Sequence, residues 1–433
     1  MMRQTAPEGR QAKSTDRIAS ERLEEILRRV LEYAEGERYA GYNKFDALNS
    51  PFLKRLSFDR KWLRFALTQA VMRSPWNLRP LLGVEKTANP KGMALFAMAY
   101  LNEFKRSASE KARERAAHCL DWLLENGVRG AHGTGWGYCF DWQSTLFFAP
   151  KGSPNAIVTF FCGEAFIKGF EILGEERYLQ AAGSAARFLL RDLPVLHETG
   201  SELCIAYAPQ PVGAIVLNIN ASAGALVAKA GSLLADPALL RDARRLISFV
   251  VERRTDYHAW YYTFPPGRSP ITHDNYHTGG ILDALHDYET YTGDGIFGEI
   301  HEKGLEYYAR ELFTPDGAPK YMNDAKYPHD IHGAAQGVIS FSKAARLDPR
   351  YLELADRIAR WTLANMFDEN GGYFYYQKGR LFTKRYTLMR WCNAWMAKAL
   401  SDLLLARSAQ GALRPQPGVK RSRGPVGQDG DGR

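Results

Sequence analysis

The sequence lacks several features that would place it in a common class of protein. No apolar run approaches the ~20 residues that a membrane-spanning helix needs. The first 17 residues are polar, which predicts that they are not a secretory signal. The five cysteines are scattered without CxxC spacing, so we expect free thiols in a reducing compartment, the cytoplasm. No zinc signature such as HExxH is present, and neither a metal nor another cofactor is predicted.

The chain is basic, but its positive charge does not concentrate on one element. The formal net charge is +9, of which residues 1–17 contribute +2 and residues 408–433 contribute +3. A nucleic-acid-binding face would gather Lys and Arg together, so we expect no nucleic-acid partner. Composition predicts a disordered N-terminus at 1–15 and a disordered basic tail at 409–433, because Pro, Gly and charge dominate there. A single folded domain is expected over 16–408.

What the sequence does contain is a repeat with a period of roughly 60 residues. In each repeat a long loop rich in Gly, aromatic and charged residues reaches an Asn or His, and a small-residue-rich apolar segment follows. These anchors are Asn89, Asn155, Asn218, Asn275, His332 and Asn393. A period of this length that holds two helical segments predicts stacked helical hairpins.

The two segments of each repeat differ in pattern. Those after the anchors are apolar nearly all round, which is typical of buried helices. Their partners are amphipathic and rich in Arg and Glu, and begin near Asp16, Ser109, Glu175, Pro237, Gly295 and Pro349. We therefore predict an all-α protein, an (α/α)6 toroid of six helical hairpins with long loops on one rim. A less regular helical solenoid is the alternative. An extra helical piece is expected at Asp59–Arg73, within the first long connection.

The loop from Gly133 to Ser144 alternates aromatic residues with Gly and Asp141. Aromatic side chains stack on sugar rings, and a carboxylate beside them can act as an acid, a base or a hydrogen-bond acceptor. We therefore take Trp136, Tyr138 and Trp142 as candidate substrate-binding residues and Asp141 as a candidate catalytic residue. The competing interpretation is that the aromatic residues only pack the rim.

Two later loops place His and Asp at corresponding positions of successive repeats. The first contains His273, Asp274 and His277, and the second contains His329, Asp330 and His332. All six belong to the candidate site: the aspartates, His277 and His332 as catalytic residues, His273 and His329 in binding. A carboxylate at a helix start is also what an N-cap requires, and this is the structural alternative for Asp274.

The last loop carries a cation and aromatic residues immediately before the final buried segment. Arg390 precedes that segment, with Tyr386 and Trp391 nearby. A guanidinium in this position could bind a carboxylate or sulfate of an acidic sugar such as a uronate. An ordinary salt bridge at the periphery is the alternative for Arg390.

Several of these segments resemble the six-hairpin glycosidase-like superfamily. The resemblance is carried by the loop at Gly135–Gln143, the following Pro154-Asn155 and the Tyr42–Pro51 segment. Within the superfamily the sequence looks most like polysaccharide-biosynthesis proteins of bacterial exopolysaccharide clusters. The resemblance implies the toroid and a glycan substrate. It does not choose between hydrolases, lyases, epimerases and non-hydrolytic members, and it assigns no catalytic pair.

The leading hypothesis from sequence is a carbohydrate-active enzyme of polysaccharide biosynthesis, most simply a glycoside hydrolase. Asp274 or Asp330 would be the general acid and Asp141 its partner, about 5–5.5 Å away for retention or roughly 6.5–9.5 Å for inversion. A lyase or C5-epimerase acting on uronates is one alternative, because rim His and Tyr residues can exchange protons beside a carboxylate. A non-catalytic glycan-binding subunit of polysaccharide assembly is another. The expected partner is a polysaccharide or oligosaccharide.

Overall fold

The computed structural model describes residues 19–145, 147–210 and 213–413. The expected N-terminal segment 1–15, and residues 414–433 of the expected tail, lie outside this range. The last helix continues to Leu413, beyond the boundary expected at 408. Among the described residues, no helix is both long enough and apolar enough to cross a membrane.

Six helices form an inner ring, and each contacts the next until the last meets the first. The inner helices are α4 (Pro90–Ser107), α6 (Ala156–Leu173), α8 (Leu217–Leu233), α10 (Asn275–Thr292), α12 (Ile331–Ala344) and α14 (Trp395–Leu413). A π-helical turn at Met389–Ala394 precedes α14. Each inner helix begins within two residues of its expected anchor, and the (α/α)6 toroid is confirmed.

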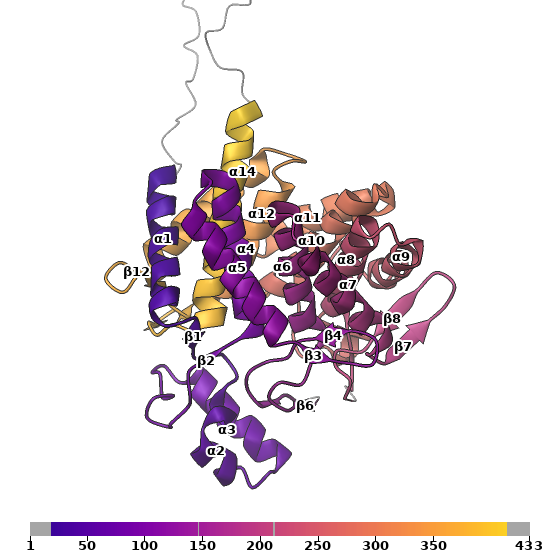
Figure 1. Cartoon of the computed structure of the whole chain (residues 1–433). Helices are drawn as coiled ribbons and strands as arrows, with labels where there is room; N and C mark the ends of the chain where they lie inside the picture. Colours follow the sequence, from indigo (N-terminus) through magenta and orange to yellow (C-terminus); the bar gives the residue numbers. More distant parts are fainter. Residues whose placement is uncertain (1–18, 146, 211–212, 414–433) are drawn as a thin grey trace, which may run out of the picture.

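Six amphipathic helices surround this ring, each packed against an inner helix. The outer helices are α1 (Ser20–Gly36), α5 (Glu110–Glu125), α7 (Glu176–Arg191), α9 (Pro237–Val251), α11 (Gly298–Glu311) and α13 (Arg350–Met366). Figure 1 shows the helices of both layers, with α1, the first of them, packed beside α14, the last.

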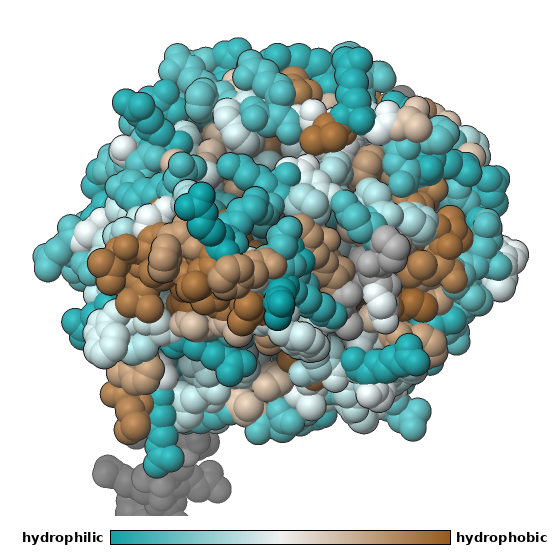
Figure 2. Space-filling view, turned by 90° about the horizontal axis from the view of Figure 1, so that it is seen from below, coloured by the Kyte–Doolittle hydropathy of each residue, from teal (hydrophilic) through white to brown (hydrophobic). Residues whose placement is uncertain are grey.

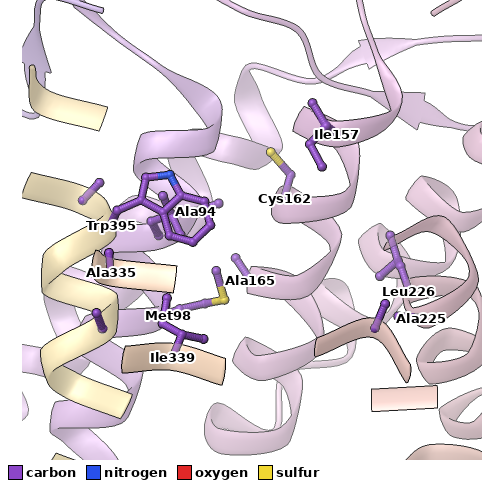
Figure 3. Close-up of a cluster of buried hydrophobic side chains, with 14 of the residues drawn as sticks. Ala94, Met98, Ile157, Cys162, Ala165, Ala225, Leu226, Ala335, Ile339 and Trp395 are labelled. Atoms are coloured by element: carbon purple, nitrogen blue, oxygen red, sulfur yellow. The ribbon is translucent and has the colours of Figure 1, made fainter. Parts of the chain in front are cut away.

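Close packing between inner helices depends on small residues. A methyl group on Gly163 of α6 would lie only 2.4 Å from Leu226 Cδ2 of α8, so no larger residue fits without movement. Alanines on α4, α6, α8 and α12 occupy similar positions, and Figure 3 shows some of them with Met98, Ile339 and Trp395. This explains the unusual richness of the inner segments in Gly and Ala.

The long connections all lie at the end of the toroid where the inner helices begin, which we call the loop rim. The other end, with the short turns from inner to outer helices, is the turn rim. Short antiparallel strands order the rim loops: β1 (Ala40–Gly41) with β2 (Thr87–Ala88), β3 (Val128–Arg129) with β4 (Thr134–Gly135), β5 (Trp142–Gln143) with β6 (Phe148–Ala149), β7 (Val195–Glu198) with β8 (Leu203–Ile205), β9 (Ile215–Val216) with β10 (Thr263–Phe264), β12 (Phe367–Asp368) with β13 (Tyr373–Phe374), and a sheet of β11 (His329–Asp330), β14 (Gln377–Lys378) and β15 (Thr383–Lys384).

The first long connection contains a helical insertion that projects from the loop rim (Figure 1). It consists of α2 (Pro51–Leu56) and α3 (Lys61–Arg73), so the expected piece at Asp59–Arg73 is present as α3. The insertion has its own small apolar cluster of Ala47, Leu53 and Val71, separate from the main core.

The recurring asparagines hold the rim loops to the inner helices. Asn155 caps α6 by accepting from the amide of Val158 at 3.1 Å. Asn275 donates from Nδ2 to the carbonyl oxygens of Leu312 and Lys320, at 3.1 and 2.6 Å. Asn393 accepts from the amide of Phe374. Part of the repeat therefore has a structural cause: Asn155 caps its helix, and Asn275 and Asn393 supply hydrogen-bond partners to buried loop backbone.

Candidate functional site

A cavity of about 1420 Å³ occupies the axis of the toroid. Its lining includes residues from the first and last turns of the inner helices, such as Lys91 and Arg106 of α4. The cavity therefore extends from the loop rim towards the turn rim. Residues at its loop-rim end come from separate repeats that the ring brings together, as the sequence pattern predicts.

A histidine of the cavity wall, His277, is held from behind by Asp274, which does not itself line the cavity. Asp274 caps α10: its Oδ1 accepts from the amide of His277 at 2.9 Å, and its Oδ2 lies 2.8 Å from His277 Nδ1. Because a carboxylate can only accept, Nδ1 must carry the proton, which leaves Nε2 as the basic nitrogen of the neutral ring. The His277 side chain lines the cavity and is 22% exposed. Asp274 is thus both a helix cap and the residue that orients His277.

Two cations reach the same end of the cavity without an acidic partner. Among the described residues, no carboxylate lies within 4 Å of the side chain nitrogens of Lys91 or Arg390, although both residues are buried. Arg390 donates from Nε to Asn43 Oδ1 at 3.1 Å, and its guanidinium lies 5.1 Å from the ring centre of Tyr138. Lys91 Nζ lies 4.0 Å from the ring centre of Phe161. Burial lowers the pKa of Lys91 well below its usual range, and Arg390 lowers it further.

Buried cations of this kind are costly unless an anion joins them. The salt-bridge alternative for Arg390 therefore has no support from the geometry. The arrangement fits a carboxylate, sulfate or phosphate on a bound ligand.

His332 also lines the cavity, but it is enclosed by aromatic rings. Tyr276 stacks on it at 4.6 Å between ring centres, and Trp395 lies at 4.1 Å. Both ring nitrogens are buried without a hydrogen-bond partner among the described residues. Burial lowers the pKa of His332 well below its usual range, and the nearby cations, Lys91 first, lower it further. His332 is therefore a neutral imidazole.

Aromatic side chains form much of the remaining wall at this end. Tyr138 and Trp142 line the cavity, as expected, and Trp142 stacks on Phe45 at 5.4 Å. Trp391 also lines it, while donating from Nε1 to Asp330 at 2.8 Å. Burial raises the pKa values of the tyrosines on this wall, so their hydroxyls stay protonated: Tyr138, Tyr207, Tyr262 and Tyr276.

None of the three proposed catalytic aspartates lines the cavity, and two of them have fully structural surroundings. Asp141 is absent from the cavity lining; its Oδ2 pairs with Lys54 Nζ at 2.7 Å and its Oδ1 accepts from the amide of Lys151. Asp330 is also absent from the lining. It caps α12 and accepts from Gln377 and Trp391, with Lys44 Nζ at 3.8 Å.

Four of the expected binding residues also lie outside the cavity lining: Trp136, His273, His329 and Tyr386. Trp136 is a core residue whose Nε1 donates to the carbonyl of Leu123. His273 bonds Trp260 and Tyr257 through its two nitrogens. His329 Nδ1 bonds the carbonyl of Pro319. These side chains stabilise the loops behind the cavity wall.

The half of the cavity nearer the turn rim is lined by a network of ion pairs. Lys229 Nζ lies 2.5 Å from Glu164 and 2.9 Å from Asp287, and Lys343 lies 2.8 Å from Asp287. Burial alone would raise the pKa of Asp287, but Lys229 and Lys343 outweigh it and hold that pKa far below its usual range. Asp283, close by, forms no ion pair with any residue that the structure describes; burial raises its pKa, and Gln336 donates to it at 2.9 Å.

Sequence reasoning missed Lys91, Tyr207, Tyr262 and Tyr276 on the cavity wall. Lys91 stands two residues after the anchor Asn89, so the position of that anchor was the available signal. Among the residues that the structure describes, no three His, Cys, Asp or Glu side chains gather as a metal site would require. All five cysteines are free.

The sequence matches no family model, and it matches no curated protein. Solved structures, in contrast, share the fold. Cellobiose 2-epimerase from Bacillus thermoamylovorans B4167 aligns with a TM-score of 0.59 and 13% identity over 74% of this chain and 88% of its own. A possible GH105 member from Salmonella enterica serovar Paratyphi A aligns at 0.60 and 12% identity, over 94% of this chain and 100% of its own.

An unsaturated glucuronyl hydrolase specific for heparin aligns at 0.55 and 12% identity, over 76% of this chain and 89% of its own. These structures are six-hairpin glycosidase-like enzymes. At such low identity the likeness establishes the (α/α)6 toroid alone.

Proposed function

We propose that this protein is an enzyme that moves a proton at the carbon beside a sugar carboxylate, a C5-epimerase or lyase acting on uronate units of an oligosaccharide or polysaccharide. The observation that carries the proposal is the meeting of His277, backed by Asp274, with the unpaired cations Arg390 and Lys91 at one end of the cavity. A base and an anion site are the two elements that this chemistry needs.

In the proposed reaction His277 Nε2 takes the proton from C5, and the electron pair moves into the carboxylate as an enediolate. Arg390 and Lys91 stabilise the charge that develops there. In an epimerase, a proton then returns to the opposite face of C5 from one of the protonated tyrosines. In a lyase, the electron pair instead expels the glycosidic oxygen at C4, which takes its proton from one of these tyrosines as it leaves.

The activities of two structural neighbours support a reaction of this kind. One is an epimerase acting on a disaccharide, and one acts on a glucuronyl unit. We further propose that the reaction belongs to polysaccharide biosynthesis, which the sequence resemblance to exopolysaccharide-cluster proteins supports, and that it takes place in the cytoplasm, which the scattered cysteines support.

Glycoside hydrolysis is the second candidate, and one observation favours it. Asp283 lines the cavity, has no cationic partner within 4 Å among the described residues, and has a raised pKa because of its burial. A carboxylic acid of this kind can protonate a leaving glycosidic oxygen. Asp283 would then replace Asp274 and Asp330 as the general acid.

Incubation of uronate-containing oligosaccharides in heavy water, followed by mass spectrometry, separates these reactions. One deuterium gained without cleavage indicates epimerisation, cleavage without added water indicates a lyase, and cleavage with added water indicates a hydrolase. The His277→Gln variant should lose the activity, whereas Asp141→Asn should keep it. Hydrolysis that survives His277→Gln and disappears in Asp283→Asn would overturn the proposal in favour of the second candidate.

A further inference from the structure

The α2–α3 insertion exposes an unusual number of large apolar side chains. Trp62 is 65% exposed, Trp76 is 74% exposed and Leu81 is 85% exposed. With their exposed neighbours they form what we call the insertion patch: Phe52, Leu56, Phe58, Trp62, Leu63, Trp76 and Leu81. Clustered aromatic residues on a surface mark a site of interaction, because leaving them in water costs free energy.

The insertion patch is not the unfilled side of a larger core. The apolar cluster beneath it contains only Ala47, Leu53 and Val71 as buried members among the described residues, with Leu67 and Leu82 packed against them. The aromatic residues of the patch are therefore not members of this cluster and are exposed to solvent. Figure 2 looks at this rim and shows a broad brown area interrupted by teal side chains.

The surroundings of the patch are strongly basic. Residues 51–83 contain one acidic residue, Asp59, and seven basic residues: Lys54, Arg55, Arg60, Lys61, Arg64, Arg73 and Arg79. Arg79 is buried against Asp46, and Arg64 pairs with Asp59. The side chains of Arg55, Arg60, Lys61 and Arg73 have no carboxylate within 4 Å among the described residues and belong to exposed residues.

A second exposed apolar element lies beside the insertion. The turn between β14 and β15 carries Leu381, 91% exposed, and Phe382, 53% exposed. This hairpin is joined to the end of α3 because Lys384 Nζ donates to the carbonyl of Met72 at 3.1 Å. Apolar side chains thus extend across adjoining parts of the loop rim.

We propose that the insertion patch binds the surface of a bilayer that contains anionic phospholipid. Tryptophan and phenylalanine insert at the headgroup level, and Lys and Arg around them attract negatively charged lipid. A protein partner would have to supply an acidic, apolar surface of matching shape, whereas the bilayer interface supplies both properties without shape. Docking here would hold the loop rim, where the cavity begins, against the membrane.

The test is flotation of the full-length protein with vesicles, in the absence of any saccharide. Vesicles of phosphatidylcholine alone are compared with an equal mixture of phosphatidylcholine and phosphatidylglycerol. We expect binding to the anionic vesicles, a blue shift of tryptophan fluorescence, and weakening by salt. The double variant Trp62→Ser/Trp76→Ser should partition at least about tenfold more weakly.

The matched control is Ile296→Ser/Leu347→Ser, which changes two exposed apolar residues near the turn rim, 57% and 50% exposed. It should bind as the unmodified protein does. The Arg55→Gln/Lys61→Gln variant should lose the preference for anionic vesicles while the basic chain ends stay unchanged.

Failure to bind anionic vesicles would overturn the proposal, as would equal binding by all variants. Light scattering adds a further check: an oligomer that dissociates on Trp62→Ser/Trp76→Ser, with vesicle binding unchanged, would make the patch a protein interface instead. Because no substrate is present, these outcomes are independent of the proposed reaction.

Discussion

Asp274 combines two roles that sequence analysis treated as competitors. Its Oδ1 caps α10 and its Oδ2 holds His277 Nδ1. One short side chain can do both because His277 lies three residues after the cap, in the first turn of the helix. Its backbone amide and its side chain are therefore both within reach of the Asp274 carboxylate. A carboxylate at a helix start is therefore not diagnostic by itself; the histidine three residues later is the informative feature.

The two roles of Asp274 can be separated by substitution. Asparagine caps helices as well as aspartate does, so Asp274→Asn should change the free energy of unfolding by less than about 1 kcal/mol. Activity should fall by roughly 10²–10⁴-fold, because an amide does not stabilise the charged imidazole that forms during proton transfer. Turnover and thermal unfolding measure the two effects.

Asp236→Asn is the matched control, since Asp236 caps the outer helix α9 in the same way. The Asp236→Asn variant should change neither the turnover nor the free energy of unfolding appreciably. Equal losses of activity in the two variants would contradict an orienting role for Asp274.

Substitution of Arg390 tests the proposed anion site. Arg390→Gln should lower kcat/KM for a uronate substrate by about 10²-fold, because the developing negative charge loses a charged hydrogen-bond donor. The same oligosaccharide with its carboxylate reduced to an alcohol cannot react, but it can bind, and its dissociation constant should change little in the variant. Arg385→Gln, an exposed site five residues earlier, serves as control. Equal losses of binding for the charged and the reduced oligosaccharide would show that Arg390 acts only through packing.

At the scale of elements, the starts of the inner helices were predictable, whereas the residue that caps each of them was predictable only in part. The repeat of anchors placed every inner helix, since buried helices without a polar face are distinctive in sequence. The residues that cap α10 and α12 are Asp274 and Asp330, however, rather than the anchors Asn275 and His332. Which residue caps a helix depends on the exact position at which the helix begins. A periodic pattern locates that position only to within one or two residues.

Two adjacent glycines of α10 give a sharp test of helix packing. A methyl group on Gly279 would lie 2.6 Å from Gln336 Cγ and 2.8 Å from Tyr308 Oη, whereas one on Gly280 would meet nothing within 4 Å. We expect Gly279→Ala to lower the free energy of unfolding by about 1–3 kcal/mol. Gly280→Ala should raise it by roughly 0.5–1 kcal/mol, because alanine favours the helix. Chemical denaturation measures both, and similar values for the pair would contradict close packing of α10 on α12.

At the scale of the whole molecule, ring closure decides which polar residues share the cavity. Sequence order identified the loops that reach the rim, and Tyr138, Trp142, His277, His332, Arg390 and Trp391 do line the cavity. It could not separate these from Trp136 or His273, which belong to the same loops but face the core. The side of an irregular loop that faces a cavity follows from tertiary contacts, not from composition. The basic character of residues 51–83 was likewise missed, because the net charge was considered for the whole chain between its two basic ends.

The interior of the ring also predicts how stability depends on pH. Burial lowers the pKa of His286 to about 4 and that of His301 to about 3, and it lowers the pKa of His332 as well. Between these values and the unfolded value near 6.5, the unfolded chain binds protons that the folded chain does not. Stability should therefore be fully present above about pH 6.5 and be lost as pH falls towards 4.

His286→Gln isolates one contribution to this acid sensitivity. A neutral amide cannot titrate, so the variant should lose less stability between pH 6.5 and pH 4, by on the order of 2 kcal/mol, while remaining similar to the unmodified protein at pH 8. Urea denaturation at a series of pH values measures the difference. Carboxylates remote from His286 titrate alike in both proteins and cancel in the comparison, while, despite its burial, the pKa of the neighbouring Asp287 is held below this pH range chiefly by Lys229 and Lys343. An identical slope in the two proteins would mean that His286 gains its proton in the folded state as readily as in the unfolded one, and that the cavity admits enough water to solvate it.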